Sequence, residues 1–72
     1  MVRQMLKNKR LAAGYTQKEV ADFVEIDRTF YTNIENGRKN CSMQVWLKIG
    51  AALNIPEEEL INYIKEGMKK GA

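Results

Sequence analysis

Apolar residues recur along this chain at spacings of three and four, which is the period of an amphipathic helix rather than of a strand. β-branched residues are scattered instead of alternating with polar ones, and Pro56 is the single proline. The pattern therefore predicts an all-α chain of short helices. The expected helices span residues 2–13, 17–24, 28–36, 43–53 and 57–68.

Polar residues suited to starting a helix stand immediately before three of these segments. Thr16 is followed three residues later by Glu19, which matches the Thr-x-x-Glu capping box. Asp27 and Ser42 are good N-caps for the third and fourth helices, and Pro56 is well placed to open the fifth. The helix ends are expected at residues that tolerate a left-handed backbone, namely Gly14, Gly37 and Asn54.

The apolar positions of each segment predict which side faces the core. Within residues 57–68, Leu60 and Ile64 are spaced four apart and mark one side of that helix. The inward residues expected in the first four helices are Val2, Met5, Leu6, Ala13, Val20, Ala21, Val24, Tyr31, Ile34, Val45, Trp46, Ile49, Ala52 and Leu53.

Composition narrows the possible chemistry. At 72 residues the chain is expected to be a single domain, and no apolar run approaches the length of a membrane span. With no histidine and the single cysteine Cys41, it lacks the residues for a zinc site or for a Cys-His or Ser-His dyad. We therefore expect no enzyme activity, no metal or other cofactor and no small-molecule ligand. The absence of a signal-like N-terminus and of paired cysteines predicts a cytoplasmic protein.

Charge is distributed unevenly. Residues 1–50 hold nine Lys or Arg against five Asp or Glu, which gives +4, whereas residues 51–72 hold three against four, which gives −1. A basic first portion favours contact with a polyanion, although a solvated cationic face is also common in small proteins.

The segment 17–37 is the most informative. It predicts two short helices set at an angle by a brief break at residues 25–27, and the outward side of the second is polar and cationic. Such a pair places a helix in the major groove of DNA.

An ordered series of residues extends this pattern over much of the chain. Arg10 and Gly14 precede the pair Thr16-Gln17, Val20-Ala21 follows, and Ile34-Glu35-Asn36-Gly37 leads directly into Arg38 and Lys39. From about Leu6 to Leu60 the chain thereby resembles the XRE-like helix-turn-helix family of phage Cro and repressor proteins. The resemblance implies a compact five-helix lambda-repressor-like domain over residues 1–72, with its helix-turn-helix motif at about 17–36. In size the chain resembles the small members of the family, which are Cro-like phage repressors and the controller proteins of restriction-modification systems. The stretches Arg-Thr-Phe-Tyr at 28–31 and Arg-Lys-Asn-Cys-Ser at 38–42 lean faintly toward the controller proteins.

The resemblance also assigns roles to residues of this chain. It implies base contacts from Arg28, Thr29, Thr32 and Asn33. It implies contacts with the DNA backbone from Gln17, Asn36, Arg38, Lys39 and Asn40, through cations and backbone amides. It further implies that Arg10 and Glu35 form a structural ion pair. The alternative for each exposed polar residue is simple solvation.

The chain departs from the family pattern at three positions. Glu25 stands where the family usually has glycine in a left-handed turn, which costs another residue roughly 1–2 kcal/mol. Cys41 stands where many members have proline, and its thiol is either buried and inert or accessible. Phe30 occupies a position that is often small and polar, so it either contacts DNA or rests against the second helix.

Helix 57–68 is the candidate dimerisation element, because its apolar residues cover more of its circumference than burial in one domain requires. The expected interface residues are Ile55, Ile61, Tyr63, Ile64 and Met68. Alternatively, Leu60 and Ile64 enter the core while Ile61 and Tyr63 stay partly exposed. The sequence thus predicts a transcriptional regulator that binds a double-stranded DNA operator as a homodimer. The alternative function is an antitoxin-type protein-interaction module.

Overall fold

The computed structural model describes the backbone of residues 3–70 and the side chains of residues 3–66. Within that range the chain forms five helices and no strands: α1 (Gln4–Ala13), α2 (Gln17–Val24), α3 (Arg28–Glu35), α4 (Met43–Ala52) and α5 (Glu57–Lys70). The predicted all-α fold is confirmed, although Val2 lies outside the described residues and α5 continues past Met68. Among the described residues, no helix combines the length and apolarity needed to cross a membrane.

The predicted helix starts are confirmed by hydrogen bonds. The Glu19 amide donates to Thr16 Oγ1 at 3.1 Å and the Thr16 amide donates to Glu19 Oε1 at 2.9 Å, which completes the capping box. The Asp27 carboxylate accepts from the Thr29 amide at 2.9 Å. Ser42 Oγ accepts from the Val45 amide at 3.3 Å. Short polar side chains therefore satisfy amides that each helix start leaves free.

All five helices and the links between them contribute to one core. Its buried apolar residues are Leu6, Val20, Ala21, Val24, Tyr31, Ile34, Trp46, Ile49, Leu53, Ile55 and Leu60. The expectation that Ala13 faces inward was wrong, because it is exposed in the last turn of α1. The chain turns away there at Gly14, whose surroundings are open space, so no element packs over that turn.

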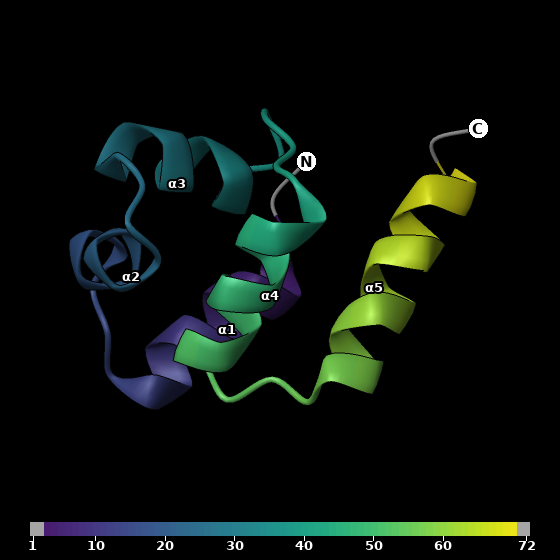
Figure 1. Cartoon of the computed structure of the whole chain (residues 1–72), viewed down its shortest axis with the longest axis horizontal. Helices are drawn as coiled ribbons and strands as arrows, with labels where there is room; N and C mark the ends of the chain where they lie inside the picture. Colours follow the sequence, from purple (N-terminus) through teal and green to yellow (C-terminus); the bar gives the residue numbers. More distant parts are fainter. Residues whose placement is uncertain (1–2, 71–72) are drawn as a thin grey trace.

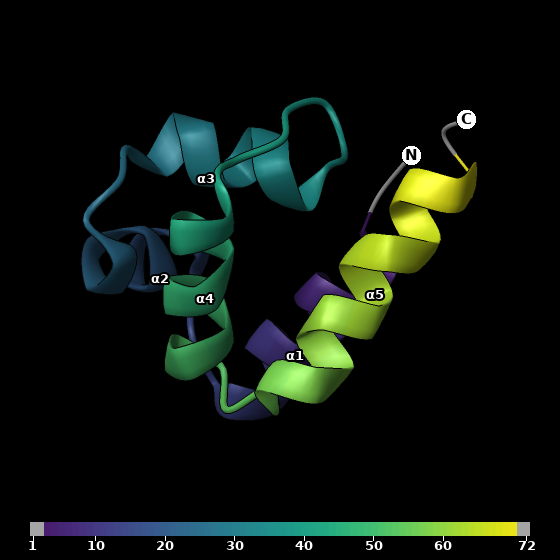
Figure 2. The same ribbon diagram turned by 45° about the vertical axis from the view of Figure 1, so that its right-hand side comes forward.

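The helices are arranged around α4, which lies in the middle of the molecule (Figure 1). Helix α2 packs against both α3 and α4, and α1 contacts α3. Helix α5 packs against α4 and lies on the opposite side of the molecule from α2 (Figure 2). Gly50 in α4 permits close approach of α5, because a Cβ at that position would lie 2.7 Å from Leu60 Cδ2. This arrangement leaves one side of α3 uncovered.

The turn between α2 and α3 has a left-handed residue that is not glycine. Glu25 has φ 59° and ψ 42°, as the sequence comparison with the family pattern suggested. The next amide, that of Ile26, donates to the Ala21 carbonyl at 3.0 Å, so the turn closes α2 in the usual way. The side chain at residue 25 is exposed and makes no hydrogen bond or ion pair within the described residues that would offset the backbone cost.

Replacing Glu25 with glycine is expected to stabilise the protein by about 0.5–1 kcal/mol, because glycine adopts this conformation freely but loses more entropy on folding. Thermal and urea unfolding would measure the change. Asn54→Gly is the matched control: Asn54 is also left-handed, with φ 56°, but asparagine tolerates that region better. A Glu25→Gly protein no more stable than the parent would show that the turn carries no strain.

Candidate DNA interface

Helices α2 and α3 form a helix-turn-helix. In Figure 1, α2 is seen nearly end-on whereas α3 runs across the view, so the two helices cross at a steep angle. Val20, Ala21 and Val24 of α2 are buried, as are Tyr31 and Ile34 of α3. The shared core thus fixes the angle between the helices and decides which side of α3 is free.

The uncovered side of α3 carries the residues predicted to contact bases. Arg28 and Thr29 are exposed, and Thr32 and Asn33 are partly exposed. Arg28 takes part in none of the ion pairs among the described residues, so its guanidinium keeps all of its donors. The side chains suited to bidentate base contact, Arg28 and Asn33, lie on the same helix, five positions apart.

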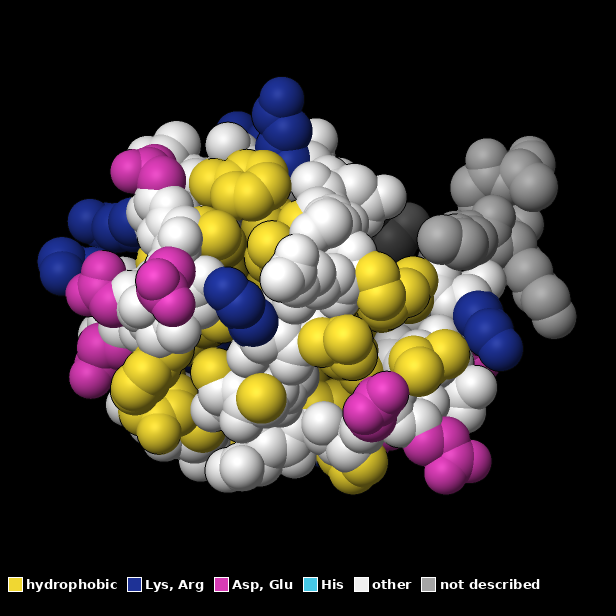
Figure 3. All heavy atoms as spheres, viewed as in Figure 1, with side chains coloured by type: hydrophobic (Ala, Val, Ile, Leu, Met, Phe, Trp, Pro, Cys, Tyr) yellow, Lys and Arg dark blue, Asp and Glu magenta, His cyan; other side chains and the backbone are white. Residues whose placement is uncertain are grey.

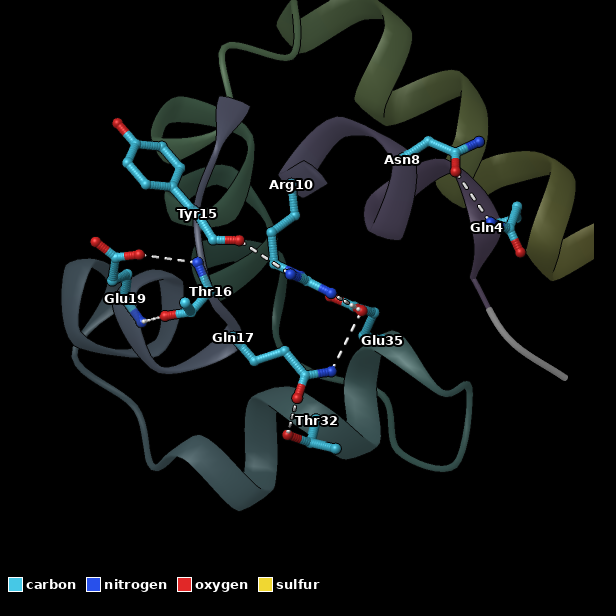
Figure 4. Close-up of polar contacts among 9 residues, drawn as sticks. All are labelled: Gln4, Asn8, Arg10, Tyr15, Thr16, Gln17, Glu19, Thr32 and Glu35. Carbon is cyan, nitrogen blue, oxygen red and sulfur yellow. Dashed lines mark hydrogen bonds and ion pairs between the residues drawn. The ribbon is translucent and has the colours of Figure 1, made fainter. Parts of the chain in front are cut away.

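Gln17 and Thr32 are held by a hydrogen-bonded chain behind this face (Figure 4). The Thr32 hydroxyl donates to Gln17 Oε1 at 3.1 Å, and Gln17 Nε2 donates to Glu35 Oε1 at 3.3 Å. One amide proton of Gln17 stays free, because Nε2 carries two. The start of α2 is therefore tied to α3 through side chains as well as through the core.

The Arg10–Glu35 ion pair is confirmed and is almost fully buried. Arg10 Nε lies 2.9 Å from Glu35 Oε2, and Nη2 donates to Oε1 at 2.9 Å, so the contact is bidentate. Arg10 Nη1 also donates to the Tyr15 carbonyl at 2.9 Å. Arg10 is 8% exposed and Glu35 is 1% exposed. The pair thus links α1, the start of α2 and α3.

Burial acts to raise the pKa of Glu35, but the hydrogen bonds to its carboxylate, the one from Arg10 first among them, and the charge of Arg10 together outweigh burial, so the pKa lies below its ordinary value. The same hydrogen bond raises the pKa of Arg10. The Tyr31 hydroxyl is buried beside the pair without a well-aligned hydrogen-bond partner, and burial raises the pKa of Tyr31. Glu35 is therefore a charged structural residue at neutral pH.

The segment after α3 presents the remaining predicted contacts. Gly37 has φ 78° and ends the helix. The Arg38 and Lys39 amides donate to the Asn33 carbonyl at 2.9 and 3.2 Å, and the Asn36 amide donates to the Thr32 carbonyl at 2.9 Å. These amides are already used to close α3, so what this segment presents to an anion is chiefly its exposed cations (Figure 3, upper edge).

One organising residue was missed by the sequence analysis. Arg3 donates to the Lys39 carbonyl at 2.9 Å and to Asn40 Oδ1 at 3.0 Å. Asn40, expected to contact the DNA backbone, is exposed, but its side-chain oxygen Oδ1 already accepts a hydrogen bond from Arg3. No local pattern signals a contact that joins residues 36 or more positions apart.

An open groove of about 870 Å³ runs between α1 and the starts of α2 and α3. The cations Lys7, Lys18 and Arg28 line it, with Gln17 between them. Lys9, by contrast, pairs with Glu59 of α5 at 3.5 Å. Three cations from the basic first portion of the chain therefore lie together beside α2 and α3, in keeping with the uneven charge of the sequence.

The structure also shows the surroundings of Phe30 and Cys41, the two other departures from the family pattern. Phe30 is partly buried and packs against the core, in keeping with the second of its two alternatives. Cys41 is half-buried, and burial raises its pKa to about 11, so the thiol stays protonated at neutral pH.

The residues expected at a dimer interface divide into two groups. Ile55, in the link between α4 and α5, is 5% exposed and belongs to the core, so it has little surface to offer a partner. Tyr63 and Ile64 are half-buried and pack against the core. Ile61 is also half-buried but does not belong to the residues that pack against the core. The side chain of Met68 lies outside the described residues.

Known proteins similar to this chain are regulators and control proteins. The chain is 42% identical to the uncharacterized HTH-type transcriptional regulator YqaF of Bacillus subtilis (strain 168), over the whole length of both proteins. It is 33% identical to the control protein C.MunI of a Mycoplasma species, over 88% of this chain and 85% of that protein.

A solved structure is also similar. The restriction-modification controller protein C.AhdI from Aeromonas hydrophila matches with a TM-score of 0.73 and 35% identity, over 79% of this chain and 86% of that one. Residues 6–60 match the Helix-turn-helix family. The match begins two positions into α1, covers α2, α3 and α4, and ends in the first turn of α5. The chain is therefore a member of the XRE-type helix-turn-helix family of transcriptional regulators, whose members bind DNA.

Proposed function

We propose that this chain is a sequence-specific transcriptional regulator that binds a double-stranded DNA operator as a homodimer through α3. The observation that carries the proposal is the free side of α3, where Arg28 and Thr29 are exposed while the opposite side is buried. A helix fixed from behind and polar in front suits the major groove, in which each base pair presents a distinct hydrogen-bonding pattern.

The proposed contacts fall into two kinds. Arg28, Thr29 and Asn33 read base edges, and Thr32 acts with them while its hydroxyl holds Gln17. The contacts with phosphates come from a wider set of residues, namely Gln17, Asn36, Arg38, Lys39 and Asn40. Lys7 and Lys18, which line the groove beside α2, add to this set. Contacts of the second kind set affinity and its salt dependence, whereas those of the first kind set sequence preference.

The homodimer follows from the small number of base contacts that one domain can make. Two copies related by a two-fold axis read half-sites about 34 Å apart. Helix α5 is the proposed interface, because it lies on the side of the molecule away from α2 and Ile61 shows its apolar side chain without packing on the core. Tyr63 and Ile64 flank it and complete the apolar surface.

Ile61→Asp tests the dimer. We expect this variant to sediment as a monomer and to lose most of its affinity for the operator, because a charge in an apolar interface has no partner. Asn62→Asp adds the same charge at an exposed neighbouring position and serves as the matched control. A variant of Ile61 that keeps the mass of a dimer would place the interface elsewhere.

The operator itself can be found by selecting bound sequences from a pool of random duplexes. The proposal predicts a palindrome whose half-sites lie about one helical turn, or a multiple of it, apart. Selection of a single unrepeated site would contradict the two-fold arrangement.

We further propose that the regulator is a controller protein of a restriction-modification system. The restriction-modification controller C.AhdI shares 35% identity with this chain, which favours a controller role. A nuclease or methylase gene beside this one would support that role. A neighbouring toxin-like gene would instead favour the antitoxin alternative, for which the described residues and the relatives give no support.

A further inference from the structure

Arg3 joins three parts of the chain that are distant in sequence. Its guanidinium donates to the carbonyls of Ile34 and Lys39, the latter at 2.9 Å, and to Asn40 Oδ1 at 3.0 Å. Its Cζ atom lies 5.2 Å from the centre of the Trp46 ring in α4. Its own amide donates to the Glu35 carbonyl at 2.8 Å. The residue before α1 thus touches the end of α3, the segment 36–41 and α4.

These contacts match what the end of α3 and the following segment need. The last carbonyls of a helix have no partner within it and carry partial negative charge, so a cation there is favourable. Residues 36–41 have no regular secondary structure beyond the turn at Gly37, and they carry Arg38 and Lys39. Arg3 supplies hydrogen bonds to this segment from outside it, at residues 39 and 40.

Only an arginine can make this set of contacts at once. Its planar guanidinium donates along several fixed directions while one face lies on an aromatic ring. A lysine would keep the positive charge at the end of α3 but would lose the forked hydrogen bonds. The comparison of arginine with lysine therefore separates geometry from charge.

We propose that Arg3 is a positioning residue for DNA binding, which holds the segment 36–41 so that Lys39 and Arg38 meet the phosphates without a further ordering cost. This inference rests on the proposed function. A segment that is ordered before binding loses less conformational entropy when it binds, and the saving appears as affinity. Arg3 itself stays engaged with its own chain, so its effect on DNA passes through the segment.

The first test measures the segment in the absence of DNA. In Arg3→Lys, amide hydrogen exchange at Arg38 and Lys39 is expected to speed up by about tenfold, while the Asn62 amide in α5 keeps its rate. Arg3→Gln, which also keeps a polar side chain, is a second variant in case one folds poorly. Unchanged exchange at residues 38 and 39 in both variants would overturn the inference whatever the protein binds.

The second test is a double-mutant cycle measured as affinity for the selected operator. Lys39→Ala is expected to weaken binding about fivefold in the parent but less than about twofold in the Arg3→Lys background, because the phosphate contact is already compromised there. Lys7→Ala is the control, since Lys7 is an exposed cation outside the segment. Its effect should be the same factor in both backgrounds.

The outcomes separate the two proposals. An equal loss from Lys39→Ala in both backgrounds would overturn the role of Arg3 and leave the proposed function standing. No loss from Lys39→Ala in the parent would overturn the proposed phosphate contact of the segment, and the inference with it.

Discussion

Glu35→Ala is expected to destabilise the protein by about 3 kcal/mol, because removing one partner of a buried ion pair leaves the other charge without compensation. Arg10 is only 8% exposed and would keep one hydrogen bond, to the Tyr15 carbonyl. A chain of 72 residues has a free energy of unfolding of roughly 4–11 kcal/mol, so such a loss is a large share of it. Urea unfolding monitored by circular dichroism measures the change.

Glu66→Ala is the matched control, since Glu66 is exposed on α5 and its loss should change stability by less than about 0.5 kcal/mol. The double variant Arg10→Met with Glu35→Leu should recover much of the loss, because apolar residues of similar size can replace a buried ion pair. Equal stability of the Glu35→Ala protein and the parent would show that the pair contributes nothing to the fold.

The same ion pair predicts how stability depends on pH. The pKa of Glu35 is lower in the folded protein than its ordinary value of 4.5, so the unfolded chain takes up a proton first as the pH falls. The contribution of Glu35 is therefore fully present above about pH 4.5 and is lost as the pH falls toward its folded pKa. Unfolding curves of the parent and of Glu35→Gln should converge over that acidic range.

Arg28→Ala is expected to lower affinity for the selected operator by about 30-fold or more, because a bidentate base contact discriminates by ~1–3 kcal/mol and a dimer makes it in both half-sites. Arg28 is exposed, so the fold should be unaffected. The loss should vanish on operators altered at the base pairs that Arg28 reads. Fluorescence anisotropy with labelled duplexes, at one fixed salt concentration, measures both effects.

Lys39→Ala provides the contrast, because a phosphate contact weakens binding to every sequence alike and lowers the salt slope by about one per contact. Lys65→Ala removes the same charge from α5, on an exposed position, and should change neither quantity appreciably. Losses from Arg28→Ala that are equal on operator and random duplexes would remove α3 as the element that reads sequence.

Local rules predicted the secondary structure well because their causes are local. The capping box at Thr16 and Glu19 and the N-caps Asp27 and Ser42 each satisfy amides within three residues, so sequence neighbours decide them. The Arg10–Glu35 pair joins α1 to α3, and it could be anticipated only through the family pattern.

Other features depend on packing that no local pattern carries. Ala13 matched the apolar spacing of α1, but Gly14 turns the chain away before any element covers it. Ile55 looked available as an extension of the apolar side of α5, yet it closes the core between α4 and α5. Arg3 gave no signal at all, because its hydrogen-bond partners lie 31 to 37 positions away in the sequence.

Amide chemical shifts recorded while the selected duplex is added to the labelled protein test the DNA-contacting surface most directly. We expect the largest changes on Arg28, Thr29 and Asn33 and on residues 37–40, with small changes on the outer side of α5 around Glu66. Largest changes on α5, with α3 left unperturbed, would contradict this expectation.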